Sequence, residues 1–335
     1  MSSTSSNDAQ VIELLKHISD YISRYFSMFI FLIGTIGNTL NIFILSQRSL
    51  RQIPCIFFFF ASSIASLISI DFGLITRVLS GWAVDPTYTI GWFCKVRTFI
   101  VFSSRAMVFW FFVLATIDRW LSSSVQIHHR QLSTLKNARR ATAVVILITM
   151  IVYGELLYCY DANLIDAPFK CYAKTHACQL LADMTFVCFT TSVPILIMFI
   201  FGLLTISNIR QSQRRILQMT SIAINPTISA TNHEFQQRSK KNEQHLLLMV
   251  FVQVFVLAIL TLPQAIQRLY AAFIGSYNSQ LQATIDMFVY NFVLLLTYLA
   301  SATPFYIYTL TGGTLFRKAS LEFMQSIYRA IRRRC

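Results

Sequence analysis

Long apolar stretches, each almost free of charge, alternate along the chain with short polar or basic stretches. A helix needs about 20 mostly apolar residues to cross a membrane. Seven stretches reach about this length when an isolated charged residue is tolerated. They predict seven membrane-spanning helices, at residues 26–45, 53–80, 99–117, 141–159, 184–206, 246–266 and 287–310.

The composition agrees with this pattern. Of the 335 residues, 55% are apolar and 13% are charged, whereas a soluble domain has about 45–50% and about 25%. So little charge cannot cover a soluble globule, and a disordered chain would be polar and poor in aromatic residues. The sequence therefore predicts an all-α membrane protein, a bundle of seven transmembrane helices in a lipid bilayer.

The basic residues indicate the orientation of the bundle. The net charge is +14, but the bases are not clustered on a soluble face, so nucleic acid is not an expected partner. With the N-terminus outside the cell, 19 of the 28 bases lie on the inner side, where loops carry an excess of Lys and Arg. We therefore expect a multi-pass protein of the plasma membrane with an extracellular N-terminus.

Three parts of the chain follow from these predictions. Residues 1–21 form an extracellular segment that is too short for a folded binding domain, and residues 22–311 form the seven-helix domain. In residues 312–335, Gly312-Gly313 breaks the helix. The stretch 314–331 then places apolar residues on one face and bases on the other, which is typical of a short amphipathic helix on the cytoplasmic membrane surface.

One motif, Asp118-Arg119-Trp120, lies at the inner end of the third predicted helix. Cys94 precedes Asp118 by 24 residues, which is about 36 Å of helix and one membrane crossing. Cys94 is therefore expected at the outer end. The Asp-Arg pair is either an interfacial base beside a neutralising acid or part of a functional switch.

Three predicted helices contain a proline that removes a backbone hydrogen bond and kinks the helix: Pro194, Pro263 and Pro304. With these prolines, Asn38 in the first helix and the Asp-Arg motif, the chain resembles the rhodopsin-like (class A) G-protein-coupled receptors. The resemblance covers roughly residues 21–331. The chain also resembles invertebrate orphan receptors of the FMRFamide and neuropeptide kind.

The resemblance implies a receptor that activates a heterotrimeric G protein, and it implies no catalysis and no cofactor. In such receptors the Arg of the motif bonds an acid at the foot of helix six in the resting state. Glu243, 20 residues before Pro263, has the matching offset to pair with Arg119. Breaking this latch would let helix six swing outward from its kink. Alternatively, Glu243 merely offsets Lys240 and Lys241.

The resemblance also implies a disulfide between the head of helix three and the loop after helix four. Cys171, 23 residues before Pro194, has the spacing of the family's loop cysteine, so Cys94–Cys171 is the expected pair. Cys178 is the alternative partner of Cys94, and Cys159 with Cys178 would form a second bridge.

The chain departs from the family at several positions. Thr261 replaces the usual Trp before the helix-six proline, Thr303 replaces the Asn of Asn-Pro, and Ser66 stands where the sodium-binding Asp would be. A sodium site of the family's type is therefore not expected, and neither is any other metal. Helix seven has no Lys for retinal, and Val101 replaces the Asp of amine receptors.

Arg105 is the most informative intramembrane residue. It lies 11 residues after Cys94, about 16 Å in from that end of the helix. An Arg near the bilayer centre costs roughly 2.5–3.5 kcal/mol on insertion scales, so it needs a partner or a wet cavity. Asp71 and Glu155 are the candidate partners in a structural ion pair. Alternatively, Arg105 binds an anionic group of the ligand, such as a peptide carboxylate.

Further polar residues in the outer half complete the expected ligand pocket. Charges of both signs there favour a short peptide over a lipid as the extracellular ligand. The additional candidate residues are Arg77, Val101, Asp183, Gln264, Gln267, Arg268, Asp286, Tyr290 and Asn291.

Two other classes of function compete with a receptor coupled to a G protein. Seven-helix ligand-gated channels of the chemosensory type have the N-terminus inside, which the distribution of bases opposes. Transporters tend to contain internal repeats and broken helices, and the sequence contains no such repeat.

Overall fold

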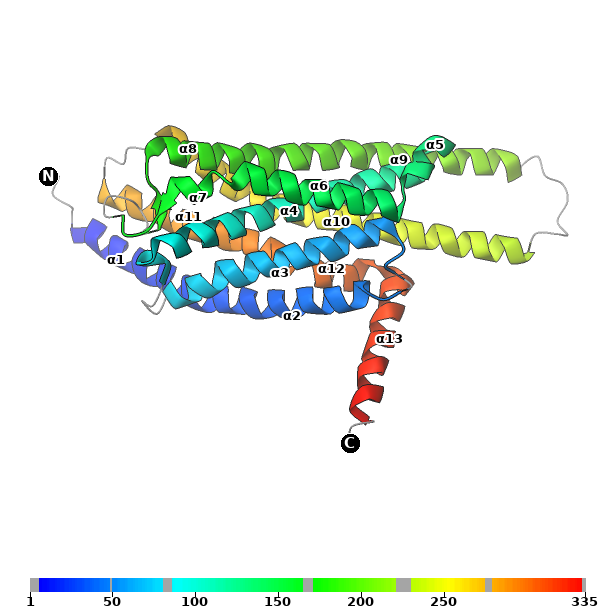
Figure 1. Ribbon diagram of the computed structural model, residues 1–335, viewed down its shortest axis with the longest axis horizontal. Coiled ribbons are helices and arrows are strands. Elements are labelled where there is room, and N and C mark those ends of the chain that lie inside the picture. The colour runs from blue at the N-terminus through cyan, green and yellow to red at the C-terminus, as the bar shows by residue number, and fades with distance from the viewer. Residues whose placement is uncertain are drawn as a thin grey trace.

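The computed structural model describes residues 6–48, 50–80, 86–164, 171–220, 230–274 and 279–332. In these residues, seven helices that are long and apolar enough to cross a membrane lie side by side in a bundle (Figure 1). They span Asn7–Leu45, Pro54–Leu79, Gly91–Ser123, Leu135–Cys159, His176–Ser212, Gln244–Phe273 and Gln280–Ala302. The predicted seven-helix bundle is therefore confirmed.

The first and fifth spans each contain a π-helical turn. The first consists of α1 (Ser6–Tyr21), η1 (Ile22–Phe26) and α2 (Ser27–Leu45). The fifth consists of α8 (His176–Thr185), η3 (Phe186–Ser192) and α9 (Val193–Thr220). A π turn inserts one residue per turn relative to an α-helix and rotates the side chains that follow it. Apolar periodicity alone did not indicate either turn.

The remaining elements complete the bundle and its connections. They are α3 (Pro54–Ser80), η2 (Pro86–Tyr88), α4 (Gly91–Ser123), α5 (Ile127–Leu132), α6 (Leu135–Tyr153), α7 (Leu156–Cys159), β1 (Tyr160–Asp161), β2 (Tyr172–Ala173), α10 (Ala230–Ile274), α11 (Gln280–Ala302), α12 (Pro304–Thr311) and α13 (Gly313–Arg332).

The seventh predicted stretch, residues 287–310, is divided between α11 and α12, because the helix breaks at Thr303 before Pro304. Proline has no backbone N–H and disfavours the helical conformation of the residue before it.

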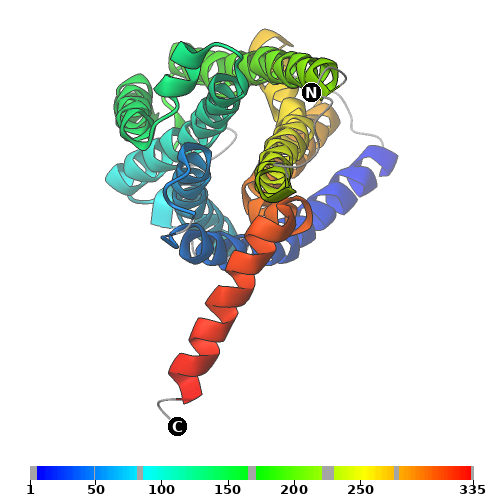
Figure 2. The same cartoon turned by 90° about the vertical axis from the view of Figure 1, so that its right-hand side faces the viewer.

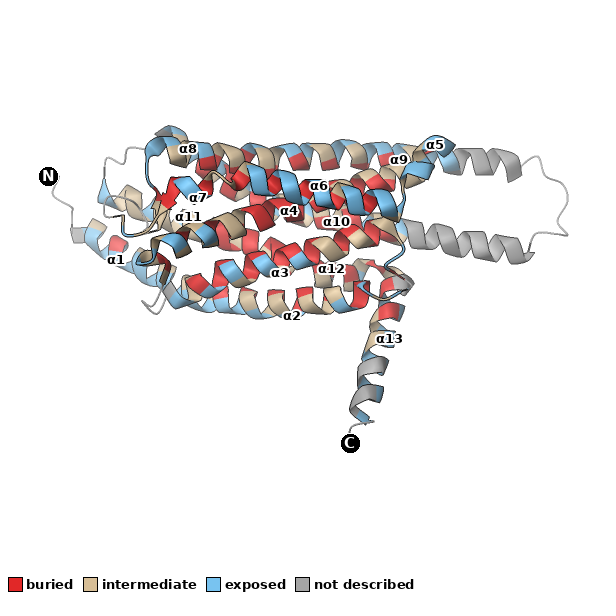
Figure 3. Ribbon diagram, in the orientation of Figure 1, coloured by how far each residue is buried: buried red, intermediate tan, exposed pale blue. Residues whose placement is uncertain are grey.

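Burial is concentrated between the helices, while the outward faces carry exposed side chains (Figure 3). The central helix is α4, where 72% of the apolar window is buried. It packs against α3, α6 and α9. Large apolar side chains such as Phe199 and Phe255 are exposed on the outside of the bundle. An apolar exterior of this kind is suited to lipid rather than water.

One end of the bundle carries a short antiparallel hairpin, in which Tyr160 pairs with Ala173 and Asp161 with Tyr172. Two disulfides hold the hairpin to the helices: Cys94–Cys171 joins it to α4, and Cys159–Cys178 joins α7 to α8. These are the expected pair and the second bridge considered from the sequence. We call this end of the bundle the disulfide end.

At the opposite end, α13 leaves the bundle steeply (Figures 1 and 2). The turn requires glycine, because Gly313 has φ of 58° and a Cβ there would meet the ring of His245. Phe316 and Ala319 are buried, and the Phe323 ring stacks on Phe43 with centroids 5.6 Å apart. The first turns of α13 thus pack on the bundle, while its predicted position on the cytoplasmic membrane surface stays a prediction.

Candidate functional site

A cavity of about 420 Å³ lies at the disulfide end. Its walls come from α1, α3, α4, α10, α11 and the β1–β2 hairpin, so residues far apart in sequence surround one space. Its lining includes five basic side chains and one acidic side chain. The basic residues are Lys16, Arg77, Arg97, Arg105 and Arg268, and the acid is Asp20.

Of the two bases that α4 contributes to the lining, Arg105 lies further from the disulfide end than Arg97. The guanidinium carbon of Arg105 is 4.4 Å from the centroid of the Tyr298 ring, a cation–π contact. The side chain of Tyr298 in turn lies against Gly73 of α3, where a Cβ would overlap the phenol. Because Gly73 has no side chain, it leaves room for the Tyr298 ring that contacts Arg105.

Arg77 of α3 is held from α11. Both of its terminal nitrogens donate to the Asn291 side-chain oxygen at 3.2 Å. The Asn291 amide nitrogen donates to Ser19 Oγ of α1 at 3.4 Å. This chain of hydrogen bonds joins three helices along one wall of the cavity.

Arg268 of α10 forms a buried ion pair with Asp183 of α8. Its guanidinium also lies over the rings of Phe186 and Phe102, 4.7 Å and 5.2 Å from the centroids. A buried ion pair needs such additional contacts because both charges have lost their water. Arg268 thereby fixes α10 to α8 beside the cavity.

The structure brings together half of the residues predicted for the ligand pocket. Those that line the cavity are Arg77, Val101, Arg105, Arg268, Tyr290 and Asn291. Those outside the lining are Asp71, Glu155, Asp183, Gln264, Gln267 and Asp286. Because the predicted acids are in the second group, the lining has a strong excess of positive charge, with Asp20 as its one acid.

The predicted ion pair of Arg105 is wrong. None of the ion pairs among the described residues joins Arg105 to Asp71 or Glu155. Asp71 lies on the face of α3 toward α2, where Thr35 donates to it at 3.3 Å. Glu155 lies beside Thr185 of α8. Both acids therefore have threonine partners on neighbouring helices instead of Arg105.

Several lining residues were missed from the sequence, chiefly on α1. Residues 1–21 were expected to be an extracellular segment too short for a folded binding domain and were not included in the predicted pocket, but Lys16, Ser19 and Asp20 line the cavity. A signal was present, since residues 7–21 contain no Pro or Gly and Ile12 and Leu15 recur near helical spacing. Arg97 and Tyr298 were also overlooked.

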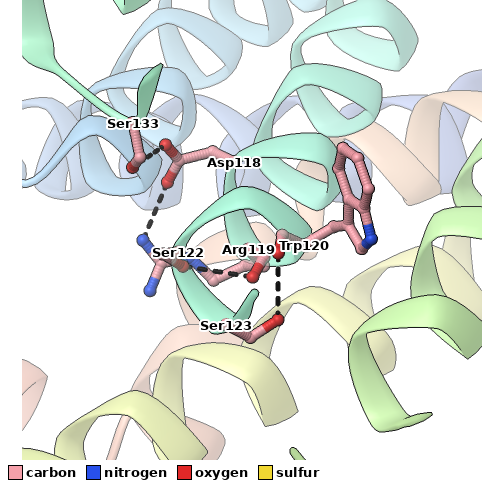
Figure 4. Close-up of polar contacts among 6 residues, drawn as sticks. All are labelled: Asp118, Arg119, Trp120, Ser122, Ser123 and Ser133. Carbon is pink, nitrogen blue, oxygen red and sulfur yellow. Dashed lines mark hydrogen bonds and ion pairs between the residues drawn. The ribbon is translucent and has the colours of Figure 1, made fainter. Parts of the chain in front are cut away.

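The opposite end of α4 carries the Asp-Arg motif (Figure 4). Arg119 Nη2 donates to Asp118 Oδ2 at 2.8 Å, and both side chains are more than nine-tenths buried. Ser133, in the connection before α6, donates to the other Asp118 oxygen at 2.5 Å. Trp120 points away from the pair and packs edge-on against Phe201 of α9.

Comparison with protein families agrees with the seven-helix bundle. The model of the 7 transmembrane receptor (rhodopsin family) matches residues 37–308. The chain belongs to the rhodopsin family of receptors. A comparison with curated proteins gave no match. Members of this family are signalling receptors of the membrane and not enzymes.

The structure clarifies how this rhodopsin-family receptor departs from its family at helix seven. Thr303, in place of Asn, bonds back to the Ala300 carbonyl at 3.0 Å. The family's motif also has a tyrosine after the proline, and here Tyr306 and Tyr308 follow Pro304. Tyr308 is fully buried and stacks on Phe59, while Tyr306 is more than a third exposed and donates to the Ile33 carbonyl. Tyr308 is therefore the one that faces the interior.

The structure also gives the positions of four other residues that the sequence singled out, Ser66, Pro263, Pro304 and Glu243. Ser66 is fully buried, and no group of three or more His, Cys, Asp or Glu within the described ranges is placed to hold a metal. Pro263 lies inside α10 and Pro304 begins α12. Glu243 belongs to α10, but its side chain lies outside the described part of the molecule, so the latch to Arg119 stays a prediction.

Proposed function

We propose that the chain is a cell-surface receptor with its disulfide end outside the cell. A short extracellular peptide binds the cavity, and a heterotrimeric G protein binds the end that carries Asp118 and Arg119. A volume of about 420 Å³ is within the range of about 300–1,000 Å³ of small-ligand pockets. It can hold one end of a peptide, but not a folded hormone.

The observation that carries this proposal is that α4 contributes to both sites. Arg105 in the cavity and Arg119 in the buried pair are 14 residues apart, about 21 Å along one helix. A ligand that repacks the cavity therefore acts on the same rigid element that holds the Asp-Arg pair. We infer that activation swings the inner part of α10 outward from Pro263 and frees Arg119 for the G protein.

The test measures nucleotide exchange on a panel of purified G proteins in membranes that contain the full chain. Exchange above that of membranes without the receptor is expected, and Arg119→Ala should abolish it. Arg139→Ala, which removes a base from α6, is the matched control and should keep exchange. Full exchange in Arg119→Ala at equal expression would refute the mechanism.

A further inference from the structure

We propose that the ligand of this receptor carries a carboxylate on an apolar body, and that Arg105 is the residue that holds it. This inference rests on the proposed function of the cavity as the ligand site, and it adds the chemical class of the ligand.

The charges around the cavity are not balanced by the protein. Of the five basic side chains in the lining, Arg268 alone has a carboxylate partner within the described ranges, namely Asp183. Arg97 donates to the carbonyl oxygens of Phe72 and Gly73, at 3.3 Å and 3.0 Å. Arg77 donates to the neutral amide oxygen of Asn291. The site therefore carries positive charge for which a bound anion would supply the counter-charge.

Among the arginines of the lining, Arg105 is the one with two buried nitrogens that lack a hydrogen-bond partner in the described residues. It is only 3% exposed, and its Nε and Nη2 atoms have no hydrogen-bond partner among the described residues. A buried cation without a partner is strongly unfavourable, and contact with the Tyr298 ring offsets only part of that cost. An anion in the cavity would stabilise the guanidinium more than it would stabilise any of the other four bases.

The position of the unpartnered nitrogens restricts how an anion can approach. The Tyr298 ring lies on one side of the guanidinium, and the two nitrogens without a partner, Nε and Nη2, form one edge of the guanidinium plane. A planar carboxylate accepts two parallel N–H bonds along such an edge. A phosphate can accept the same two bonds, but its further oxygen and its second negative charge would stay buried beside Arg105 without a partner. The two unpartnered donors of Arg105 therefore favour a singly charged carboxylate over a phosphate.

The other lining residues describe what carries the carboxylate. Val101 and Phe102 lie on α4 near Arg105, and Met287 and Leu294 line the facing wall from α11. Apolar side chains beside a charged anchor are typical of pockets for a ligand that has an apolar part. A peptide that ends in an apolar residue with a free carboxyl group has this chemistry, whereas a peptide with a C-terminal amide does not.

The experiment uses purified full-length receptor in lipid nanodiscs and measures its Tm with matched probes. The probes are N-acetyl amino acids with apolar side chains, their amides, and the corresponding phosphonates, at constant ionic strength. At least one carboxylate should raise the Tm with an apparent Kd at least ten-fold below that of its amide and its phosphonate. In Arg105→Gln this preference should disappear, while Arg139→Gln, with the same charge removed at the opposite end, should keep it.

Arg105→Lys keeps the charge without the planar fork and should bind the same carboxylate less tightly than the wild type, which separates loss of binding from misfolding. The inference is overturned if no carboxylate shifts the Tm, if amides or phosphonates act as well as carboxylates, or if Arg105→Gln keeps the preference. Nucleotide exchange by the same preparation tests the receptor function separately. Exchange that depends on Arg119 without any carboxylate binding would overturn only the ligand class.

Discussion

Asp118 and Arg119 form a buried pair on one helix, with Ser133 as a third member. Asp118→Asn keeps the shape of the side chain but removes the charge that attracts Arg119. A loss of about 1 kcal/mol from the resting state raises a small active fraction roughly five-fold. We therefore expect basal nucleotide exchange to increase about five-fold per receptor at the cell surface.

The matched control for that prediction is Asp161→Asn, the same substitution at the disulfide end. It should leave basal exchange unchanged when data are normalised to surface expression. If Asp118→Asn does not differ from this control, the pair has no part in holding the receptor at rest.

A second prediction at the residue scale concerns Gly73, which lies against the Tyr298 ring that contacts Arg105. Gly73→Ala would place a methyl group into the Tyr298 phenol. Overpacking of this kind costs about 1–3 kcal/mol, and moving the ring also displaces the guanidinium that stacks on it. We expect a lower Tm of the purified receptor and weaker binding of any ligand held by Arg105.

Gly154→Ala serves as the control for Gly73→Ala, because a Cβ at position 154 would meet only the carbonyl oxygens of the preceding turn. Equal Tm values for the two variants would show that Tyr298 can move aside without cost.

At this scale the sequence indicated which residues matter better than it indicated what they contact. The cost of a charge in a membrane is a property of Arg105 itself, so its importance was predictable. Its neighbour was not, because Tyr298, Asp71 and Glu155 all lie at compatible depths. Only the rotation of each helix about its axis decides which of them meets Arg105, and apolar runs without strong periodicity do not define that rotation.

At the scale of elements, the β1–β2 hairpin is held by ion pairs of Asp161. Asp161 Oδ2 lies 3.3 Å from Lys174 Nζ and 3.6 Å from Lys95 Nζ of α4. The backbone N–H of Ala162 donates to the same carboxylate at 3.0 Å. This backbone hydrogen bond, followed by the two lysines, lowers the pKa of Asp161 below its ordinary value.

The lowered pKa of Asp161 predicts a pH dependence. The folded-state pKa is below the unfolded value of about 3.9, so the ionised carboxylate stabilises the fold above pH 3.9. That contribution is lost as the pH falls through the folded-state pKa. The Tm of Asp161→Asn should therefore lie slightly below that of the wild type at neutral pH and converge with it in acid.

Because the Asp161 side chain is 35% exposed, water and salt screen its ion pairs and the difference in Tm should be small. High salt should shrink it further. A difference in Tm that stays constant from pH 7 to strong acid would show that the carboxylate charge does not act there.

The elements themselves were predictable where they are long and apolar, and less so at their ends. A stretch without charges marks where a helix crosses lipid, but α4 continues on both sides through Lys95 and Arg119. The extension of the first span into α1 follows from contacts with α11, such as the bond from Asn291 to Ser19. The helical spacing in residues 7–21 indicated a helix there, but it did not indicate which helix α1 contacts.

For the whole molecule, orientation in the membrane is the prediction with the widest consequences. An epitope tag before Ser2 should bind antibody on intact cells, and one after Cys335 only after permeabilisation. The reason is the excess of bases at the end that carries Arg119 and α13. The reverse labelling would favour a chemosensory channel and would move the basic cavity into the cytoplasm.

The unbalanced positive charge of the cavity acts beyond the residues that line it. Fields of exposed charges persist over about 8 Å at physiological ionic strength and further in dilute solution. An anion near the mouth would be steered inward before it touched a side chain, so charge would govern the frequency of productive encounters more than the lifetime of the complex. At equal ligand concentration, the same receptor would then respond more slowly in concentrated saline than in a dilute medium.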